Sequence, residues 1–371
     1  MTVRVPLADL SSFVRSVLAE CGLDEQAAGT AADVITYADA HGFTTHGTNG
    51  LVNIYAPRLL DGRIAADAAP RVVRETSGAA LLDGDRGLGL VTMDLAMDIA
   101  MDKARQTGIG MVAVRNSTHF GSAGYYTQKA AAAGLIGLAM TNCGAQGVAP
   151  PLGGTVRMLG TNPISAAVPV TEGVPFVLDM STTVVATGKI KAAHREGREV
   201  PREWLVRHDG TPTTDPAAFM AEEADVAWLG GPAETGGAKG FGLALLVDLL
   251  CGPLSGSAYG PRPGVLEGQP AGDDNVGHTA IVIDPSAFGS AHDIAAENRV
   301  LLDTVANSPA AAYATRGVTY PGAPEAARYE RSRREGVELP LPVAEGLTAL
   351  AGRLGVTAPG ALAAQDLRAA A

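Results

Sequence analysis

The stretch IGMVAVRNSTHFGSAGYYTQKAAAAGLIGLAM, residues 109–140, decides the expected fold. It opens with an apolar run of strand length, residues 109–114, and closes with a second one, residues 135–140. Between them, residues 123–133 have the composition of a helix that Gly134 can end. Strand–helix–strand alternation is typical of layered α/β (α+β) architecture, which is therefore the predicted fold class.

Both ends of the chain look different from this middle part. Apolar spacing predicts helices over residues 10–18, 24–40 and 51–60, and again over 294–305, 324–334 and 343–353. Further strands are expected at 79–82, 176–178 and 279–283, and further helices at 90–105 and 241–250. Residues 252–277 are expected to be a loop or linker, and the Ala-rich residues 361–371 to fray. The pattern predicts a mainly helical domain formed by residues 1–75 plus 276–371, with an α/β domain, residues 76–275, inserted into it.

The composition excludes several classes of function. The chain has 371 residues, 46% of them hydrophobic, which is enough for a substantial core and for two domains. A net charge of −11 repels a phosphate backbone, so nucleic acid is not an expected partner. Three cysteines without a CxxC motif favour a cytoplasmic location and argue against a structural zinc site. No signal peptide and no membrane span are expected.

The segment AHGFTTHGTNG, residues 40–50, follows a predicted helix and holds two histidines. His46 can exchange a proton near neutral pH, and Thr45 or Thr48 can orient its ring. The alternative is a helix-capping loop with threonine as the N-cap, which spacing alone slightly favours. His41 and His46 are poorly spaced to bind one metal ion, and no metal site is predicted.

A second polar segment, RNSTHFGSAGY at residues 115–125, lies between a predicted strand and a predicted helix. Loops in this position carry reactive groups or bind anions in α/β proteins. His119 is therefore a candidate acid or base. A turn with a hydrogen-bonded histidine is an equally good interpretation.

Two pairs of small polar residues follow predicted strands. Thr161 and Asn162 lie in LGTNPI, residues 159–164, and Asp179 and Ser181 lie in LDMSTT, residues 178–183. Such residues can bind a ribose, a phosphate or a carboxylate. An ordinary turn and a helix N-cap explain them at least as well.

The glycine-rich segment GGAKGFG, residues 236–242, sets Lys239 at the start of a predicted helix. Backbone amides and one lysine can cradle a phosphate, although a flexible turn is equally compatible with the pattern. The segment is not a Walker A loop, because Gly240 follows the lysine. A Rossmann fingerprint is also rejected, since Gly87-Leu88-Gly89 is followed by Thr92 where the third glycine belongs.

Taken together, these segments resemble the second malate/L-lactate dehydrogenase family, which includes ureidoglycolate, sulfolactate and hydroxycarboxylate dehydrogenases, diketogulonate reductase and ketimine reductases. The resemblance runs from about residue 7 to about residue 345. It rests on motifs in one order: THG at 45–47, STHFG at 117–121, GTNP at 160–163, DMS at 179–181, GKI at 188–190, PTTDP at 212–216 and GAKGFG at 237–242.

The resemblance implies a non-Rossmann nicotinamide-binding domain, residues 76–275, and a substrate and dimerisation domain made from both termini. It implies NAD or NADP as cofactor, a small-molecule substrate, and a homodimer with clefts near the subunit interface. The implied reaction is hydride transfer between the cofactor and a 2-hydroxy or 2-oxo acid. That chemistry needs a base for the hydroxyl proton, which a histidine can supply.

The site residues follow from the resemblance position by position. Those implied in catalysis are His46 and His119. Thr45 is added as a catalytic candidate because it can orient His46, which is slightly favoured for this reason. Those implied in cofactor binding are Cys143, Asp179, Met180, Ser181, Lys239, Pro321, Gly322 and Ala323. Those expected near the substrate are Thr161, Asn162, Gly50 and Arg58.

Two departures from the family pattern affect the expected substrate. Relatives carry an arginine where this chain has Gly50, so either Arg58 or Arg115 replaces it, or the substrate is an amide, an ester or a peptide-linked 2-oxo group. Ketimine reductases of the family use a Ser-His-Asp relay, whereas this chain has Thr45 and Lys189 at the flanking positions. This difference favours carbonyl chemistry, with ketimine reduction as the alternative. An inactive cofactor-binding scaffold is the alternative from another class, and only Gly50 favours it.

Overall fold

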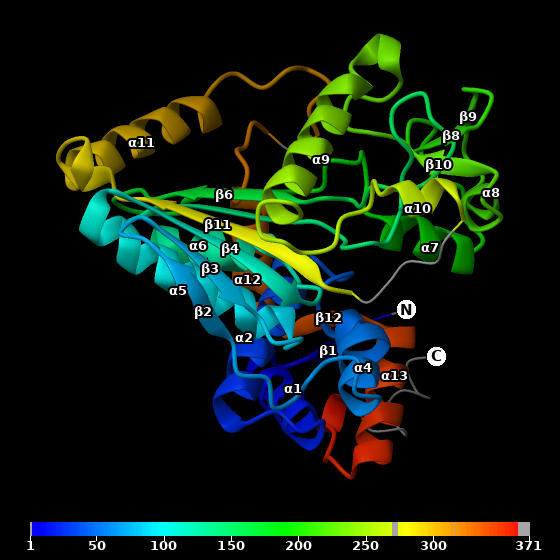
Figure 1. Ribbon diagram of the computed structural model, residues 1–371, viewed down its shortest axis with the longest axis horizontal. Coiled ribbons are helices and arrows are strands. Elements are labelled where there is room, and N and C mark those ends of the chain that lie inside the picture. Colours follow the sequence, from blue (N-terminus) through cyan, green and yellow to red (C-terminus); the bar gives the residue numbers. More distant parts are fainter. Residues whose placement is uncertain (1, 269–273, 316, 363–371) are drawn as a thin grey trace.

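The computed structural model describes residues 2–268, 274–315 and 317–362, and its centre is a seven-stranded mixed sheet (Figure 1). Strands β3 and β4 are parallel, and all other neighbours are antiparallel. In spatial order the strands are β2 (Arg71–Glu75), β3 (Ala79–Asp83), β4 (Ile109–Ser117), β11 (Val276–Ile283), β5 (Ile136–Thr141), β6 (Ile164–Val168) and β7 (Phe176–Met180).

Helices cover both faces of this sheet. On one face lie α5 (Gly89–Thr107), which ends at Gly108 in a left-handed conformation (φ 84°), and α6 (Ala123–Ala132). The side chains of Ala280 and Val282 in β11 join the core on this face. On the other face lies α9 (Gly237–Cys251), which packs against Ile281 of the same strand. Successive residues of β11 therefore serve two different cores.

The two ends of the chain pack together beside the sheet (Figure 1). Strand β1 (Thr2–Val5) pairs antiparallel with β12 (Val337–Pro340). The helices of this region are α1 (Leu7–Glu20), α2 (Glu25–His41), α12 (Ala323–Glu335) and α13 (Leu341–Leu354). The connection from α2 to β2 runs through α3 (Thr48–Gly50), a π-helical turn η1 (Leu51–Tyr55) and α4 (Ala56–Leu60).

A smaller lobe follows β7 and has a core of its own around Ile190, Phe219 and Trp228. Its three-stranded sheet has the order β10-β8-β9. The elements are α7 (Thr187–Arg195), β8 (Leu205–Arg207), β9 (Pro212–Thr213), α8 (Pro216–Met220), β10 (Ala224–Val226) and η2 (Ala233–Thr235). The remaining elements are α10 (Pro263–Leu266), η3 (Pro285–Ala287), α11 (Ala291–Ala306) and η4 (Gly360–Leu362).

The predicted α/β fold class is confirmed, with three corrections of detail. The strand at the end of the predicted loop, β11, lies at the centre of the sheet, although residue 276 was assigned to the helical domain. Edge strand β2 likewise belongs to the sheet and not to residues 1–75 as a helical unit. The single helix expected over residues 51–60 is a π-helical turn followed by α4.

The division into two domains stays a proposal, with these two strands counted with the sheet. Of the Ala-rich end expected to fray, residues 363–371 lie outside the described residues. Within the described part of the chain, no helix is long and apolar enough to cross a bilayer.

Candidate active site

His46 lies in a tight turn between α2 and α3. Helix α2 ends at Gly42 in a left-handed conformation (φ 88°). The buried carboxylate of Asp39 then accepts a hydrogen bond from the backbone N–H of Thr48 at 2.7 Å. Gly47 packs directly against this carboxylate, since a Cβ atom there would come within 2.0 Å of Asp39 Oδ1. The turn that carries His46 is therefore anchored to α2, and only glycine fits at its tightest point.

The imidazole of His46 faces a cavity of about 600 Å³. Its Nδ1 atom lies 2.8 Å from the hydroxyl of Thr45, which leaves Nε2 as the nitrogen available to a ligand. Helix α7 approaches the same turn, because a Cβ at Gly188 would lie 2.8 Å from Cγ2 of Thr45. The cavity lining also includes Ser122, Thr161, Pro163, Asp179, Met180, Ser181, Lys189, Trp204, Glu325 and Arg328.

His119 stacks against His46 from the end of β4. The two ring centroids are 5.6 Å apart and the planes differ by 18°. Nδ1 of His119 accepts a hydrogen bond from the backbone N–H of Gly121 at 3.2 Å and lies 2.8 Å from the hydroxyl of Tyr55. Because a backbone N–H can only donate, the neutral ring carries its proton on Nε2.

The surroundings of both imidazoles lower their pKa values below that of a histidine in water. Desolvation, with the neighbouring His46 acting in the same direction, lowers the pKa of His119 to about 3. Desolvation also lowers the pKa of His46, and the charge of Asp179 opposes this shift. The carboxylate of Asp179 itself has a raised pKa because of burial, although Gly124 N–H at 2.7 Å and Ser122 Oγ at 2.9 Å donate to it. Of the two rings, His46 therefore has the neighbour that favours its protonated form.

A second cavity, of about 370 Å³, continues from the first and shares Phe43, Asp179 and Glu325 with it. Its wall is the segment Tyr320–Gly322, which lies along β7, where Val177 N–H donates to the carbonyl of Pro321 at 3.0 Å. Gly322 (φ 99°) lets the two backbones approach, because a Cβ there would lie 2.9 Å from Val177 N. Both cavities are lined by residues of β7, Val177, Leu178 and Asp179 in the second and Asp179 and Met180 in the first.

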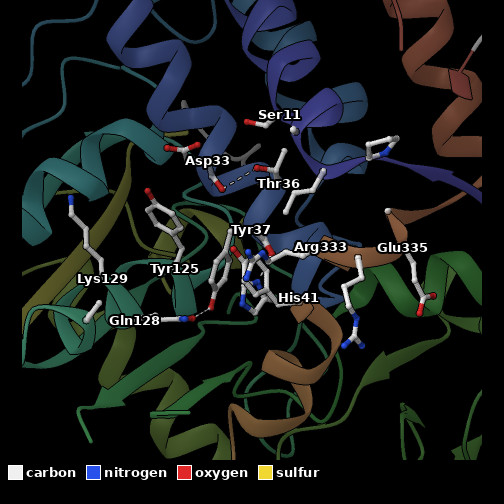
Figure 2. A pocket seen from close by; sticks show the side chains of 18 residues that line it. Ser11, Asp33, Thr36, Tyr37, His41, Tyr125, Gln128, Lys129, Arg333 and Glu335 are labelled. Carbon is white, nitrogen blue, oxygen red and sulfur yellow. Dashed lines mark hydrogen bonds between the residues drawn. The ribbon is translucent and has the colours of Figure 1, made fainter. Parts of the chain in front are cut away.

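A third cavity, of about 890 Å³, is larger but lacks the paired histidines (Figure 2). It lies between α2, α6 and α12 and shares Tyr37, His41 and Gln128 with the second cavity. The ring of His41 is tilted against Tyr37 with centroids 3.9 Å apart and stacked on Tyr329 at 4.8 Å, and its Nδ1 atom hydrogen-bonds the carbonyl of Tyr37. His41 is thus fixed within the core of the helical region.

The structure brings many of the predicted site residues together. Thr45, His46, Thr161, Asp179, Met180 and Ser181 line the first cavity, and Pro321 and Gly322 line the second. The loop that carries Thr161 is tied to the end of β7, because Thr182 N–H donates to the Thr161 carbonyl at 2.9 Å. Ala323 begins α12 directly after this wall.

Other predicted residues do not line these two cavities, and His119 is among them, with its ring against that of His46. Asn162 is fully buried, and its amide donates to Asp248 at 2.8 Å. Cys143 lies behind the same loop, since a Cβ at Gly160 would come 2.4 Å from its sulfur. Lys239 is exposed at the start of α9.

The position of the missing arginine and its two candidate replacements also lie away from the lining. Gly50 is buried, and a Cβ there would come 2.9 Å from the ring of Tyr55. Arg58 forms an ion pair with Asp274, and Arg115 forms one with Asp83 at 3.2 Å. Neither arginine lines the cavity that His46 faces.

Sequence reasoning missed two cations in the lining. Lys189 was noted only as a departure from a ketimine reductase, although the GKI motif marked its place. Arg328 carried no motif, and α12 brings it over Gly42, where a Cβ would lie 2.8 Å from its Cδ atom. Tyr55 was missed because its contact with His119 spans 64 residues.

Comparison with known proteins identifies the family of this chain. The family model described as malate/L-lactate dehydrogenase matches residues 5–348. The chain belongs to the malate/L-lactate dehydrogenase family. It is 39% identical to the malate dehydrogenase of Pyrococcus abyssi over 82% of this chain and 83% of that protein. The crystal structure of malate dehydrogenase from Entamoeba histolytica superposes with a TM-score of 0.90 at 30% identity, covering 97% of this chain and all of that one.

A third relative of this dehydrogenase family has a different kind of substrate in its name. The Δ1-pyrroline-2-carboxylate reductase of Ancylobacter novellus is 31% identical over 95% of this chain and 98% of that protein. Membership confirms the expected family and the expected class of activity. The chain is an NAD- or NADP-dependent oxidoreductase that transfers hydride to or from 2-hydroxy and 2-oxo acids or their derivatives.

Proposed function

We propose that this protein reduces a 2-oxo acid, or oxidises the matching 2-hydroxy acid, with His46 as the residue that carries the proton. The observation that supports this assignment is the position of His46, whose Nδ1 is held by Thr45 while its ring faces the cavity at the end of β7. The nicotinamide, when bound, supplies or accepts the hydride. Met180 and Ser181 would hold the cofactor in the first cavity, and Pro321 and Gly322 in the second.

The two histidines would have different roles at the carbonyl oxygen. Nε2 of His46 gives its proton to the oxygen during reduction and takes it back during oxidation. Asp179 favours the protonated form of His46. Nε2–H of His119 stays neutral and donates a hydrogen bond that polarises the carbonyl, as a pKa of about 3 permits. His46→Gln should remove the pH-dependent limb of the kcat profile, whereas His119→Gln should lower kcat and keep that limb.

Lys189 is the proposed contact for the substrate carboxylate. Arg58 and Arg115 are engaged by Asp274 and Asp83. Arg328 lies 3.4 Å from Glu325, so part of its charge is already compensated. Lys189 is exposed in the lining, and its charge acts on the pKa of His46, which places the two groups within electrostatic reach.

The experiment is NADH and NADPH oxidation by the purified protein against 2-oxo acids, their amides and esters, and cyclic imines. We expect turnover of a free 2-oxo acid, and Lys189→Met should raise its KM by roughly tenfold through loss of one charge-assisted hydrogen bond. Lys191→Met is the matched control, because Lys191 is exposed on the same helix but does not line the cavity. Turnover of amides or esters alone would contradict the role of Lys189. Cofactor binding without any turnover would favour an inactive scaffold.

Ketimine reduction is the second candidate, which the similarity to the pyrroline-carboxylate reductase supports. Lys189 follows the glycine where the reductase relay places a carboxylate, and this difference argues for carbonyl substrates. Faster turnover of Δ1-pyrroline-2-carboxylate than of any 2-oxo acid would reverse the order of the two candidates.

We also propose a cytoplasmic homodimer. Exposed apolar side chains gather on α9 and α11, where Leu246, Leu249, Val300 and Leu301 are 47%, 59%, 58% and 60% exposed. A second copy covering such faces would bury them. The free thiols Cys21, Cys143 and Cys251 suit a reducing compartment. Light scattering of Leu249→Glu against the native protein tests the dimer: a native monomer would refute it.

A further inference from the structure

His278 is a fully buried polar side chain in the middle of the central sheet. It lies in β11, opposite Val114 of β4 on one side and Thr141 of β5 on the other. The ladder between β11 and β4 is irregular between Val276 and His278. A histidine at the centre of a sheet needs an explanation, because an apolar residue would pack there without polar partners.

Both ring nitrogens of His278 have hydroxyl partners. Nδ1 lies 2.7 Å from Oγ1 of Thr141, and Nε2 lies 3.0 Å from Oγ of Ser117. A hydroxyl can donate or accept, so the neutral ring is satisfied in either tautomer. Burial lowers the pKa of His278 to about 3, so the ring stays neutral in any ordinary assay. Its effect on the site is therefore one of geometry.

The contacts of His278 converge on the segment that carries His119. Ser117 precedes that histidine by two residues, and the backbone of Thr118 also hydrogen-bonds the His278 ring. On the following side, the ring of Phe120 stacks on His278 with centroids 5.0 Å apart and planes 16° from parallel. His278 thus contacts both chain neighbours of His119.

The opposite side of this segment is held by α5. The hydroxyl of Thr118 accepts from Gly89 N–H at 2.9 Å and donates to the carbonyl of Gly87 at 3.1 Å. A Cβ at Gly89 would come 2.0 Å from the Thr118 carbonyl oxygen, so the contact is close. Thr118, the residue before His119, is therefore held both by His278 and by the start of α5.

We infer that His278 is a positioning residue that fixes the ring of His119 beside His46 by holding the segment from Ser117 to Phe120. The inference goes beyond the proposed function and rests on it only for the kinetic readout. A displacement of about 1 Å at a reacting group can cost up to about a hundredfold in rate. Precise support of His119 can therefore outweigh the cost of burying polar groups in the sheet.

His278→Phe keeps an aromatic ring against Phe120 and removes the ring's hydrogen bonds to Thr141, Ser117 and the Thr118 backbone, and His278→Gln restores one polar group. We expect His278→Phe to lower kcat by roughly ten- to a hundredfold, with the KM of the 2-oxo acid and of the cofactor within about threefold of native. His278→Gln should recover part of the loss and carries the test if the phenylalanine variant does not fold. Thr279→Val is the matched control: Thr279 is the next residue of β11, and its hydroxyl donates to the Leu250 carbonyl of α9 at 3.0 Å.

A purely structural role would lower the melting temperature of both His278→Phe and Thr279→Val and leave kcat per folded site unchanged. That result, or an equal loss of kcat in Thr279→Val, would overturn the inference. A second readout does not need turnover: the imidazole Cε1–H resonance of His119 should shift in His278→Phe or His278→Gln and stay fixed in Thr279→Val. An unchanged resonance overturns the inference, whereas silence of the native enzyme on every substrate overturns only the proposed function.

Discussion

Replacing Thr45 by valine should slow the enzyme without altering the shape of the site. Valine keeps both branches of the threonine side chain, including the methyl position that packs against Gly188. What is lost is the single hydrogen bond of 2.8 Å to Nδ1 of His46. A bond of this kind contributes about 0.5–1.5 kcal/mol, and about 1.4 kcal/mol corresponds to a factor of ten in rate. The expected loss in kcat/KM is therefore roughly two- to thirteenfold.

The assay is initial-rate oxidation of NADH or NADPH with the best 2-oxo acid of the panel. Thr45→Ser is the matched control, because serine keeps the hydroxyl and loses only the methyl group, so its kcat/KM should stay within about twofold of native. A valine variant with native kcat/KM, or a serine variant as slow as the valine variant, would show that the hydroxyl does not orient His46.

Two further predictions concern the same turn. Desolvation holds the pKa of His46 below 6.5. Reduction of a 2-oxo acid needs the protonated ring, so its rate should fall as pH rises through a value below 6.5, and the rate of oxidation should rise over the same interval. A midpoint above pH 7 in the kcat/KM profile would contradict this. Gly47→Ala should destabilise the fold by roughly 1–3 kcal/mol in urea unfolding, since its Cβ would lie 2.0 Å from Asp39 Oδ1, whereas Gly29→Ala in α2, with open space around it, should not.

The sequence could predict those parts of the fold in which the strands and helices follow one another directly in the chain. The residues between β4 and β5 show this, because the apolar runs and the helix between them are neighbours in the chain. Strand β11 was recognised as a strand but placed in the wrong region. Its two neighbours lie more than a hundred residues earlier, and nothing local marks it as the centre of the sheet. Strand β1 was missed for the same reason, since its partner β12 is at the other end of the chain.

The contacts of the site also divide into those between sequence neighbours, which could be predicted, and those between distant segments, which could not. Thr45 and His46 are adjacent in sequence, so the hydroxyl that could orient the ring was visible before the structure. The stacking of His119 on His46 joins two segments more than seventy residues apart, and only the family pattern connected them. For Asn162, the motif marked the position, but the structure turns the amide inward to Asp248, where it supports the loop of Thr161.

Because Gly50 has no side chain, the ring of Tyr55 can lie beside it and contact His119. A Cβ at this position would press on the ring of Tyr55, and the hydroxyl of Tyr55 lies 2.8 Å from Nδ1 of His119. A large residue at position 50 would therefore have to displace the tyrosine and remove a polar partner of the histidine. With this place taken, a cation for the substrate carboxylate would come from another element. We propose that helix α7 provides it, because α7 packs on Thr45 through Gly188 and carries Lys189 as its next residue.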